Sequence, residues 1–466
     1  MSEPVGASVT LDLLRKYDRP GPRYTSYPTA MEFTSRHTAT DYREKLREAD
    51  VAGDEPLSFY VHLPFCMRRC TFCACHVVVT HKHDVSARYL EYLHREIDLL
   101  AEHLPHRRRI SQYHWGGGTP TYQTVLEMES LHRKVIEHFH IESDAEVAIE
   151  VDPRHTSFEQ IDLLKELGFN RISMGVQDFN PEVQAAINRN QTEEQTRRLY
   201  AYCRERDFHS INLDLIYGLP LQTAVRFERN VDAVLGLRPD RVALYSYAYV
   251  PWVRANQKRI DVSQLPPPDV KLRLFYIARQ KFLGAGYEQI GMDHFALPGD
   301  ELAKAVHDRR LHRNFMGYTV KMGTDMVGVG ISAIDDIRGA YIQNAKKLTT
   351  YYRALEEGRF PVERGYVLDE DDRIRRTIIM KLMCNFHLDR TEIEEAFSID
   401  FERYFAAEMT ELLAPGGPVE QGFLEILPKG LEVVGAGRLF IRNLCMVFDK
   451  YLRSGDDTKP VFSRTV

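Results

Sequence analysis

The sequence predicts an α/β fold, an open (β/α)6 partial barrel that follows an N-terminal arm and precedes a mostly helical C-terminal domain. Three observations support this prediction. Six apolar segments of strand character alternate with amphipathic helical segments between residues 57 and 248. A Pro-rich aromatic stretch comes before them, and a helical pattern of charged residues begins near residue 365. Repeated strand–helix units give parallel strands with right-handed crossovers, and a doubly wound sheet is the alternative.

Length and composition exclude several classes of protein. A chain of 466 residues indicates two or three domains, and 44% hydrophobic residues is usual for a globular protein. We find no apolar run long enough for a transmembrane helix and expect no membrane insertion. The first twenty residues lack a basic segment followed by an apolar one, so we expect a cytoplasmic protein. The net charge of −6 indicates no nucleic-acid partner. No heptad pattern is visible, so we expect a monomer.

We assign residues 1–45 to the N-terminal arm. The prolines of RPGPRYTSYPTAMEF exclude a regular helix there. An ordinary linker is polar and flexible, whereas this stretch carries three large aromatic side chains, Tyr24, Tyr27 and Phe33. We therefore expect the arm to pack over another part of the molecule and to cover the active site.

Residues 46–360 form the predicted strand–helix domain. Its strands are expected at residues 57–63, 110–115, 146–151, 171–177, 211–218 and 242–248. The first helix is expected at 86–104, where leucine and isoleucine recur at steps of three and four. Further helices are expected at 122–139, at 157–167 with Gly168 as its left-handed stop, and at 269–284.

Residues 361–466 form the predicted C-terminal domain. LDEDDRIRRTIIMKLMCNF places acidic residues before basic ones, the favourable order for a helix. RTEIEEAF predicts a second helix, and the last segment predicts a small hairpin and a closing helix. This order is compatible with a winged helix. Because no basic recognition helix is visible, we expect a structural or lid role and not DNA binding.

Four cysteines, Cys66, Cys70, Cys73 and Cys75, lie within ten residues directly after the first predicted strand. Ligands of parallel α/β folds collect at the carboxyl ends of strands, so this position favours a functional site. A zinc site would need a second pair of ligands, and the remaining cysteines are isolated. A thioredoxin-like redox pair needs fewer thiols. Thiolates are also the usual protein ligands of iron–sulfur clusters.

Polar groups follow the other predicted strands. HWGGGTPT ends the second strand with three glycines that permit close backbone approach to a ligand. Glu150 ends the third, where pairing with Arg154 is its ordinary structural role, and Gln177 ends the fourth. Asp214 lies on the fifth, where an inward carboxylate needs a partner, and Arg189 is a candidate partner. Each of these groups alone more often has a structural role. Their shared location at the carboxyl ends of the strands favours a functional site.

The spacing C-x3-C-x2-C resembles the radical S-adenosylmethionine (SAM) superfamily. The resemblance implies a [4Fe–4S] cluster held by Cys66, Cys70 and Cys73. It implies that Cys75 is not a ligand, so that one iron stays open for SAM. The glycine turn resembles the superfamily's GGE segment, with Thr119 in place of the glutamate. The resemblance to the superfamily also implies that Glu150 accepts a hydrogen bond from the SAM ribose.

Further motifs resemble bacterial oxygen-independent coproporphyrinogen III oxidases over nearly the whole chain. These are RYTSYPTA, YVHLPFCMRRCTFCAC, HWGGGTPT, IEVDPR, RISMGVQDFN, NLDLIYGLP, GMDHFALP, LHRNFMGYT and IRNLCMVFD. Ala74 stands where the family is expected to have glycine. The resemblance implies conversion of coproporphyrinogen III to protoporphyrinogen IX by oxidative decarboxylation of two propionates. It also implies an electron donor such as flavodoxin or ferredoxin, and a catalytic role for Cys75.

The resemblance also implies two SAM molecules. The first would contact Tyr60, Gly117, Glu150, Ala248 and Ile334. The second would contact Phe72, Gly118, Thr119, Gln177, Arg189 and Asp214. Arg23 and Arg313 are our candidates for propionate binding, because guanidinium pairs with carboxylate in bidentate geometry, and a surface ion pair is the alternative for both. The aromatic residues of the arm are candidates to exclude water from the site.

Three other hypotheses remain open from the sequence. The first is a haem chaperone of the same superfamily, against which Cys75 and the RYTSYPTA arm argue. The second is a haem-degrading radical SAM enzyme. The third is a zinc-stabilised α/β binding protein.

Overall fold

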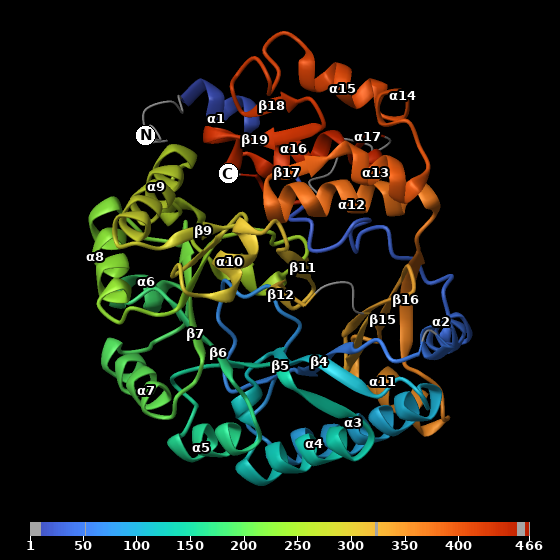
Figure 1. Cartoon of the computed structure of the whole chain (residues 1–466). Coiled ribbons are helices and arrows are strands. Elements are labelled where there is room, and N and C mark those ends of the chain that lie inside the picture. The colour runs from blue at the N-terminus through green and yellow to red at the C-terminus, as the bar shows by residue number, and fades with distance from the viewer. Residues whose placement is uncertain (1–10, 52, 322–324, 454–461, 466) are drawn as a thin grey trace.

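The computed structural model describes residues 11–51, 53–321, 325–453 and 462–465. Its centre is a twelve-stranded sheet in the order β16-β15-β14-β13-β1-β4-β5-β6-β7-β8-β10-β9. The sheet curves inside a ring of helices, and the C-terminal elements lie together at one end of the molecule (Figure 1). The edge strands β16 and β9 do not pair with each other, so the predicted open arrangement is confirmed.

All six predicted parallel strands form and pair in chain order. They are β1 (Leu57–Leu63), β4 (Arg109–Gly117), β5 (His140–Val151), β6 (Arg171–Gln177), β7 (Ser210–Tyr217) and β8 (Arg241–Ser246). A seventh strand that the sequence analysis missed, β13 (Met326–Val329), pairs in parallel with β1. Their carboxyl ends therefore share one edge of the sheet, where a ligand site is expected.

The helices between these strands cover the outer face of the sheet (Figure 1). They are α3 (His83–His103), α4 (Val125–His138), α5 (Phe158–Glu166), α6 (Pro181–Ala186), α7 (Glu193–Glu205) and α8 (Ala224–Leu235). Apolar side chains of α3, such as Leu93 and Ile97, are buried against the sheet in the largest core. Gly168 follows α5 with φ of +85°, as predicted for a left-handed stop. The predicted long helix is α9 (Pro268–Gly284).

Antiparallel strands extend both edges of the sheet. One edge adds β14 (Ile334–Ile337), β15 (Ala340–Asn344) and β16 (Val362–Val367), and the other adds β10 (His294–Ala296) and β9 (Glu288–Ile290). The helices α10 (Glu301–His307) and α11 (Leu348–Glu356) flank these edges, and β11 (His312–Asn314) forms a separate hairpin with β12 (Gly317–Thr319). Because β16 pairs with β15, the sheet extends into the range that the sequence assigned to the C-terminal domain.

The C-terminal region contains mostly helices and a three-stranded sheet in the order β17-β19-β18. Its strands are β17 (His387–Asp389), β18 (Leu424–Leu427) and β19 (Gly430–Val433). Its helices are α12 (Glu370–Asn385), α13 (Arg390–Phe397), α14 (Phe401–Tyr404), α15 (Ala406–Leu413), α16 (Ile441–Val447) and α17 (Lys450–Arg453). The two predicted helices and the hairpin with its closing helix all form, around a second apolar core.

The N-terminal arm runs from α1 (Leu11–Tyr17) to α2 (Ala39–Val51), with irregular chain between them as its prolines predict. Tyr24 and Tyr27 are buried in the core of the C-terminal region, and the Tyr24 hydroxyl donates to Asp449 at 2.9 Å. Phe33 stacks on Tyr341 with ring centroids 5.4 Å apart. The arm therefore packs as predicted, although its three aromatic side chains join the C-terminal region to the sheet.

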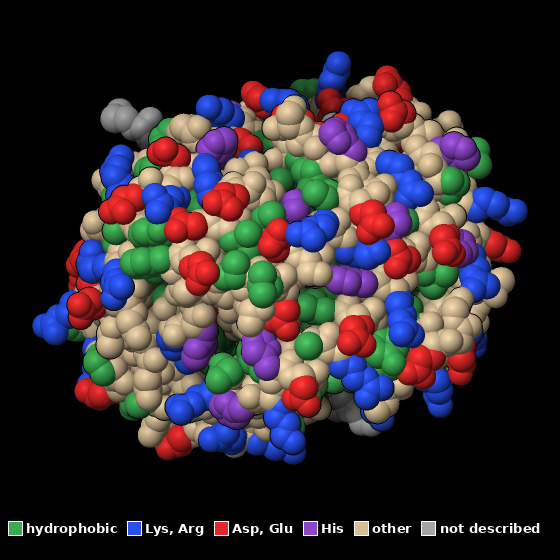
Figure 2. Space-filling view, turned by 90° about the horizontal axis from the view of Figure 1, so that it is seen from below, with side chains coloured by type: hydrophobic (Ala, Val, Ile, Leu, Met, Phe, Trp, Pro, Cys, Tyr) green, Lys and Arg blue, Asp and Glu red, His purple; other side chains and the backbone are tan. Residues whose placement is uncertain are grey.

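None of the described helices has the length and the apolar character that a bilayer crossing requires. Acidic and basic side chains are intermixed over the face in Figure 2.

Candidate functional site

A cavity of about 340 Å³ opens at the carboxyl ends of β4, β5, β6, β7 and β8. Its walls bring together twelve of the residues singled out from the sequence: Cys66, Cys70, Phe72, Cys73, Cys75, Gly117, Gly118, Thr119, Glu150, Gln177, Arg189 and Asp214. Residues from five strands and from the cysteine segment thus face one space, as the shared strand-end location predicted.

The cysteine loop, residues 66–76, is held from two sides. Cys66 ends β2 (Phe65–Cys66), which pairs with β3 (Val78–Val79), and the hydroxyl of Thr119 lies 3.6 Å from its Sγ. On the other side, Nδ2 of Asn256 donates to the carbonyl oxygens of Cys70 and Cys73 at 3.3 and 2.9 Å. These backbone contacts fix the loop conformation, so the positions of the thiols do not depend on the thiols alone.

The cysteine loop fits an iron–sulfur cluster by the chemistry of its donors. Cys66, Cys70 and Cys73 line one cavity, and two guanidinium groups approach the Cys70 Sγ, Arg154 at 3.8 Å and Arg189 at 3.9 Å. Positive charge there stabilises thiolates, which are the ligand form. Within the described residues, no three His, Cys, Asp or Glu side chains are grouped as they would be around one metal ion. A four-iron cluster binds each thiolate at a different iron, so its ligands need not converge on a point.

Asp152, which the sequence analysis did not single out, organises the two guanidinium groups. Its carboxylate pairs with Arg154 at 2.6 Å and with Arg189 at 3.2 Å, and all three groups are near the cavity wall. Although burial opposes ionisation, the two arginines hold the pKa of Asp152 well below its usual range. The alternative role of Glu150 as the ion-pair partner of Arg154 is therefore wrong, because Arg154 pairs with Asp152. Arg189 likewise pairs with Asp152 and not with Asp214.

Glu150 faces the glycine turn of β4. Its Oε2 accepts from the backbone N–H of Gly117 at 3.1 Å, and Oε1 lies 3.7 Å from Nε2 of His114. Burial opposes ionisation, but His114 and the Gly117 N–H outweigh it and lower the pKa of Glu150. An ionised, fixed carboxylate at this place can accept hydrogen bonds from a ligand hydroxyl.

The glycine turn is sterically required where it passes His62. Gly117 has φ of +116°, and a Cβ there would lie 2.6 Å from the His62 ring. A Cβ on Gly118 would lie 2.6 Å from the backbone of Pro64. Side chains at these two positions are excluded, so bare backbone of β4 faces the cavity beside the cysteine loop.

His62 links the first strand to the cysteine loop. Its Nδ1 lies 3.1 Å from the Tyr60 hydroxyl, and its Nε2 lies 3.0 Å from the carbonyl oxygen of His76. Burial lowers the pKa of His62 to about 4, so the ring is neutral near pH 7. Tyr60 itself does not line the cavity.

Asp214 and Gln177 lie on the far wall. Asp214 accepts from Asn212 Nδ2 at 2.7 Å and from Ser173 Oγ at 3.3 Å. Burial and the charge of Glu150 raise the pKa of Asp214 to about 7. Gln177 adopts φ of +68° after a register shift in β6, a backbone conformation that costs of the order of 1–3 kcal/mol. Such strain is often found at functional sites.

Two other sequence candidates lie away from the cavity wall. Ala248 follows β8, and its carbonyl oxygen accepts from Gln257 Nε2 at 3.0 Å. That same amide donates to the carbonyl oxygen of Phe72 at 2.8 Å, so Ala248 is one residue removed from the cysteine loop. Ile334 begins β14 and packs near Phe33.

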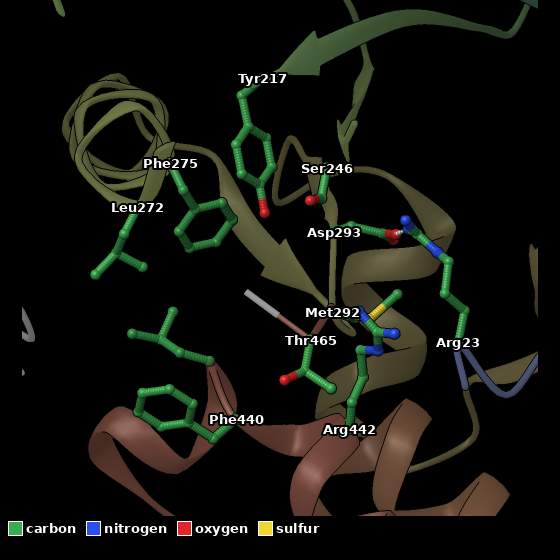
Figure 3. A pocket seen from close by; sticks show the side chains of 11 residues that line it. Arg23, Tyr217, Ser246, Leu272, Phe275, Met292, Asp293, Phe440, Arg442 and Thr465 are labelled. Carbon is green, nitrogen blue, oxygen red and sulfur yellow. Dashed lines mark hydrogen bonds and ion pairs between the residues drawn. The ribbon is translucent and has the colours of Figure 1, made fainter. Parts of the chain in front are cut away.

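Arg23 lies behind the cavity wall. Its guanidinium pairs with Asp293 and stands over the ring of Tyr245, 5.8 Å from the centroid, and Tyr245 lines the cavity. Arg23 and Asp293 also border a smaller cavity of about 50 Å³, in which Figure 3 shows Arg442 below this pair. Arg313 donates to the carbonyl oxygen of Arg23 at 3.0 Å, and its Nε has no partner among the described residues.

Comparisons with known proteins agree with this geometry. The model of the radical SAM superfamily matches residues 60–234, and the model of the HemN C-terminal domain matches residues 368–440. Members of that superfamily use a [4Fe–4S] cluster and SAM. The chain is 44% identical to the oxygen-independent coproporphyrinogen III oxidase of Pseudomonas aeruginosa, over 98% of both chains. It is 45% identical to that of Escherichia coli, over 95% of both.

A solved structure gives the same answer. Coproporphyrinogen III oxidase (HemN) from Escherichia coli, a radical SAM enzyme, superposes with a TM-score of 0.88 at 43% identity. The match covers 92% of this chain and 97% of the other. Fold, motifs and identity extend over the strand–helix domain and the C-terminal region alike. The chain therefore belongs to the family of oxygen-independent coproporphyrinogen III oxidases, within the radical SAM superfamily.

Proposed function

We propose that this protein converts coproporphyrinogen III to protoporphyrinogen IX in haem biosynthesis, by oxidative decarboxylation of two propionate side chains to vinyl groups. One observation carries the proposal. The three thiols of the C-x3-C-x2-C motif share a cavity with the polar strand-end residues, in a chain 44–45% identical to such oxidases over almost its whole length.

Cys66, Cys70 and Cys73 would hold the [4Fe–4S] cluster, beside the cationic pair Arg154 and Arg189. When bound, the cluster and SAM would supply the hydrogen-abstracting radical chemistry that oxidative decarboxylation of a propionate needs. Cys75 lines the same cavity and would act in catalysis and not as a ligand.

The chain would bind two SAM molecules. Glu150 would accept from the ribose of the first, next to Gly117. Tyr60, Ala248 and Ile334 lie outside the wall of the cavity, so their contacts with this SAM stay a prediction. The second would lie against Phe72, Gly118, Thr119, Gln177, Arg189 and Asp214, all of which line the cavity. The neighbouring main chain of β4 lets a ligand approach closely, because side chains are excluded there.

The tetracarboxylate substrate needs cations near an apolar wall. Arg23 and Arg313 are adjacent through the bond from Arg313 to the Arg23 carbonyl, and Arg23 lies directly behind Tyr245. We therefore keep both as propionate partners, with Arg23 released from Asp293 when substrate binds. A flavodoxin or ferredoxin would supply the electrons. The protein would be a cytoplasmic monomer, and the cytoplasm keeps thiols such as those of the cysteine loop reduced.

An anaerobic turnover assay tests the proposal. Reconstituted protein is incubated with SAM, dithionite and coproporphyrinogen III, and the oxidised porphyrins and CO2 are measured. We expect protoporphyrin and two CO2 per porphyrin, and neither from Cys70→Ser, whereas Cys203→Ser, a buried cysteine of α7, serves as the control. The oxidase would be contradicted if protein with an intact cluster cleaves SAM but forms no protoporphyrin. That result would favour a haem chaperone or a haem-degrading enzyme.

A further inference from the structure

Arg154 lines the cavity of the cysteine loop, and the contacts implied for the two SAM molecules do not include it. It belongs to a turn, residues 152–154, that directly follows β5. The backbone N–H groups of His155 and Thr156 donate to the carbonyl oxygen of Asp152 at 3.0 and 3.1 Å. The backbone N–H of Arg154 donates to Oδ1 of Asp152 at 3.0 Å. These bonds fix the main chain from which the side chain of Arg154 reaches into the cavity.

The guanidinium of Arg154 is held between a carboxylate and a thiol. Its Nε donates to Oδ1 of Asp152 at 3.0 Å, and its Nη2 donates to Oδ2 at 2.6 Å. The same Nη2 donates to Sγ of Cys70 at 3.8 Å. Two bonds to one carboxylate fix the plane of the guanidinium, so that one of its N–H groups is directed at the sulfur. Burial opposes the charge of Arg154, but Asp152 outweighs it and raises the pKa of Arg154 above its ordinary value.

The proposed cluster ligands have different neighbours. Cys70 receives a second cationic donor, because Arg189 approaches its Sγ at 3.9 Å. Cys66 instead has a neutral partner, the hydroxyl of Thr119, at 3.6 Å. Charge-assisted hydrogen bonds are stronger than neutral ones. Because the two guanidinium groups share the single carboxylate of Asp152, positive charge remains uncompensated beside one thiol.

We propose that Arg154 raises the reduction potential of the [4Fe–4S] cluster by donating to the thiolate sulfur of Cys70. The inference rests on the proposed function, in which Cys66, Cys70 and Cys73 hold this cluster. One-electron reduction adds a negative charge to the cluster and its thiolates, and no bond forms or breaks. Hydrogen bonds to the sulfurs and nearby positive charge stabilise that added charge, and both help to set the potentials of iron–sulfur clusters. The side chain of Arg154 is only 12% exposed, so water screens its charge weakly.

A redox titration of the reconstituted protein tests the inference without SAM or porphyrinogen. Dithionite supplies the electrons in the presence of redox mediators, and electron paramagnetic resonance measures the reduced cluster. Arg154→Met removes the charge and leaves Asp152 paired with Arg189. We expect the reduction equilibrium constant to fall about tenfold, which is a potential about 59 mV lower for one electron. Arg154→Lys keeps a cation without the planar fork, so its potential should lie between those of Arg154→Met and the parent protein.

Arg197→Met is the matched control. Arg197 lies on α7, is 41% exposed and pairs with Glu193, so the loss of its charge should leave the potential unchanged. Iron content and visible absorbance are measured first, so that only proteins with a complete cluster are compared. If Arg154→Met takes up too little iron, the comparison of Arg154→Lys with the parent protein decides.

An unchanged or higher potential in the Arg154 variants would refute the inference. Weaker SAM binding with an unchanged potential would also overturn it, and would make Arg154 a SAM-binding residue. These results leave the proposed function intact, because the parent protein still holds its cluster. If the parent protein takes up no four-iron cluster, the proposed function itself is contradicted and the inference falls with it.

Discussion

Replacing Asp214 by asparagine tests whether the cavity wall holds a carboxylate that titrates near neutral pH. Asp214 is inside the sheet on β7, where burial and the charge of Glu150 raise its pKa from 3.8 to about 7. The raised pKa means that the fold disfavours the ionised form. The contribution of Asp214 to the free energy of unfolding is therefore highest below about pH 4, near the pKa of Asp214 in the unfolded chain. It falls as the pH rises from there through the folded pKa of about 7.

The magnitude follows from the size of the shift. A change of about three pKa units corresponds to about 4 kcal/mol above pH 8, of which about 2 to 3 kcal/mol develops between pH 5 and pH 8. Asparagine has nearly the same shape and does not ionise. Its amide would face the donating Nδ2 of Asn212, which costs of the order of 1 kcal/mol at every pH. Asp214→Asn should therefore be slightly less stable than the parent at pH 4, and about 3 kcal/mol more stable than the parent at pH 8.

Urea unfolding of the cofactor-free protein measures this difference at several pH values. SAM binding gives a second readout, because ionised Asp214 attracts the positive sulfonium. The ionised fraction rises from about one tenth at pH 6 to about nine tenths at pH 8, so SAM affinity should increase up to about tenfold in the parent and not in Asp214→Asn. Parallel stability curves of the two proteins between pH 5 and pH 8 would refute the reasoning.

Three further predictions concern other parts of the molecule. Cys75→Ser should keep its iron and visible absorbance but lose turnover, and loss of iron would make Cys75 a ligand. Gly117→Ala should reduce SAM binding at least tenfold, since its Cβ would strike His62, while Gly53→Ala, at a loop position with positive φ and open space, should leave SAM binding unchanged. Arg442→Ala removes bonds to the carbonyl oxygens of Gly21 and Pro22, so limited proteolysis should cut the arm faster than in Arg403→Ala.

The strand–helix pattern was predictable because each unit is local in the sequence. Leucines of α3 at helical spacing and the short apolar strands appear within windows of ten to twenty residues. β13 was missed because it is four residues long, contains Gly328, and owes its pairing with β1 to residues more than 260 positions away. Such pairing depends on the assembled sheet and leaves no periodic signal.

The sequence was sufficient to predict where the site lies in the fold and which thiols belong to it. Residues at strand ends were expected to converge, and those from the cysteine loop, β4, β5, β6 and β7 do. Ion pairing was not predictable. Glu150 and Asp152 lie on the same side of the chain by alternation, so sequence spacing alone cannot decide which of them Arg154 contacts. His62 gave no motif of its own, although its contact with Gly117 explains the glycine there.

The packing of the arm into the C-terminal region also sets an order of events during synthesis. Gly21 bonds to Ser463, the Thr465 backbone N–H donates to Arg19, and Tyr27 is buried in the core that contains α16. At ribosomal rates of roughly 5–20 residues per second, the arm leaves the ribosome roughly 20 to 90 s before these partners do. Through nearly all of that interval Tyr24 and Tyr27 lack their partners Asp449 and Lys450, so the nascent chain is a natural client for chaperones that bind exposed aromatic segments.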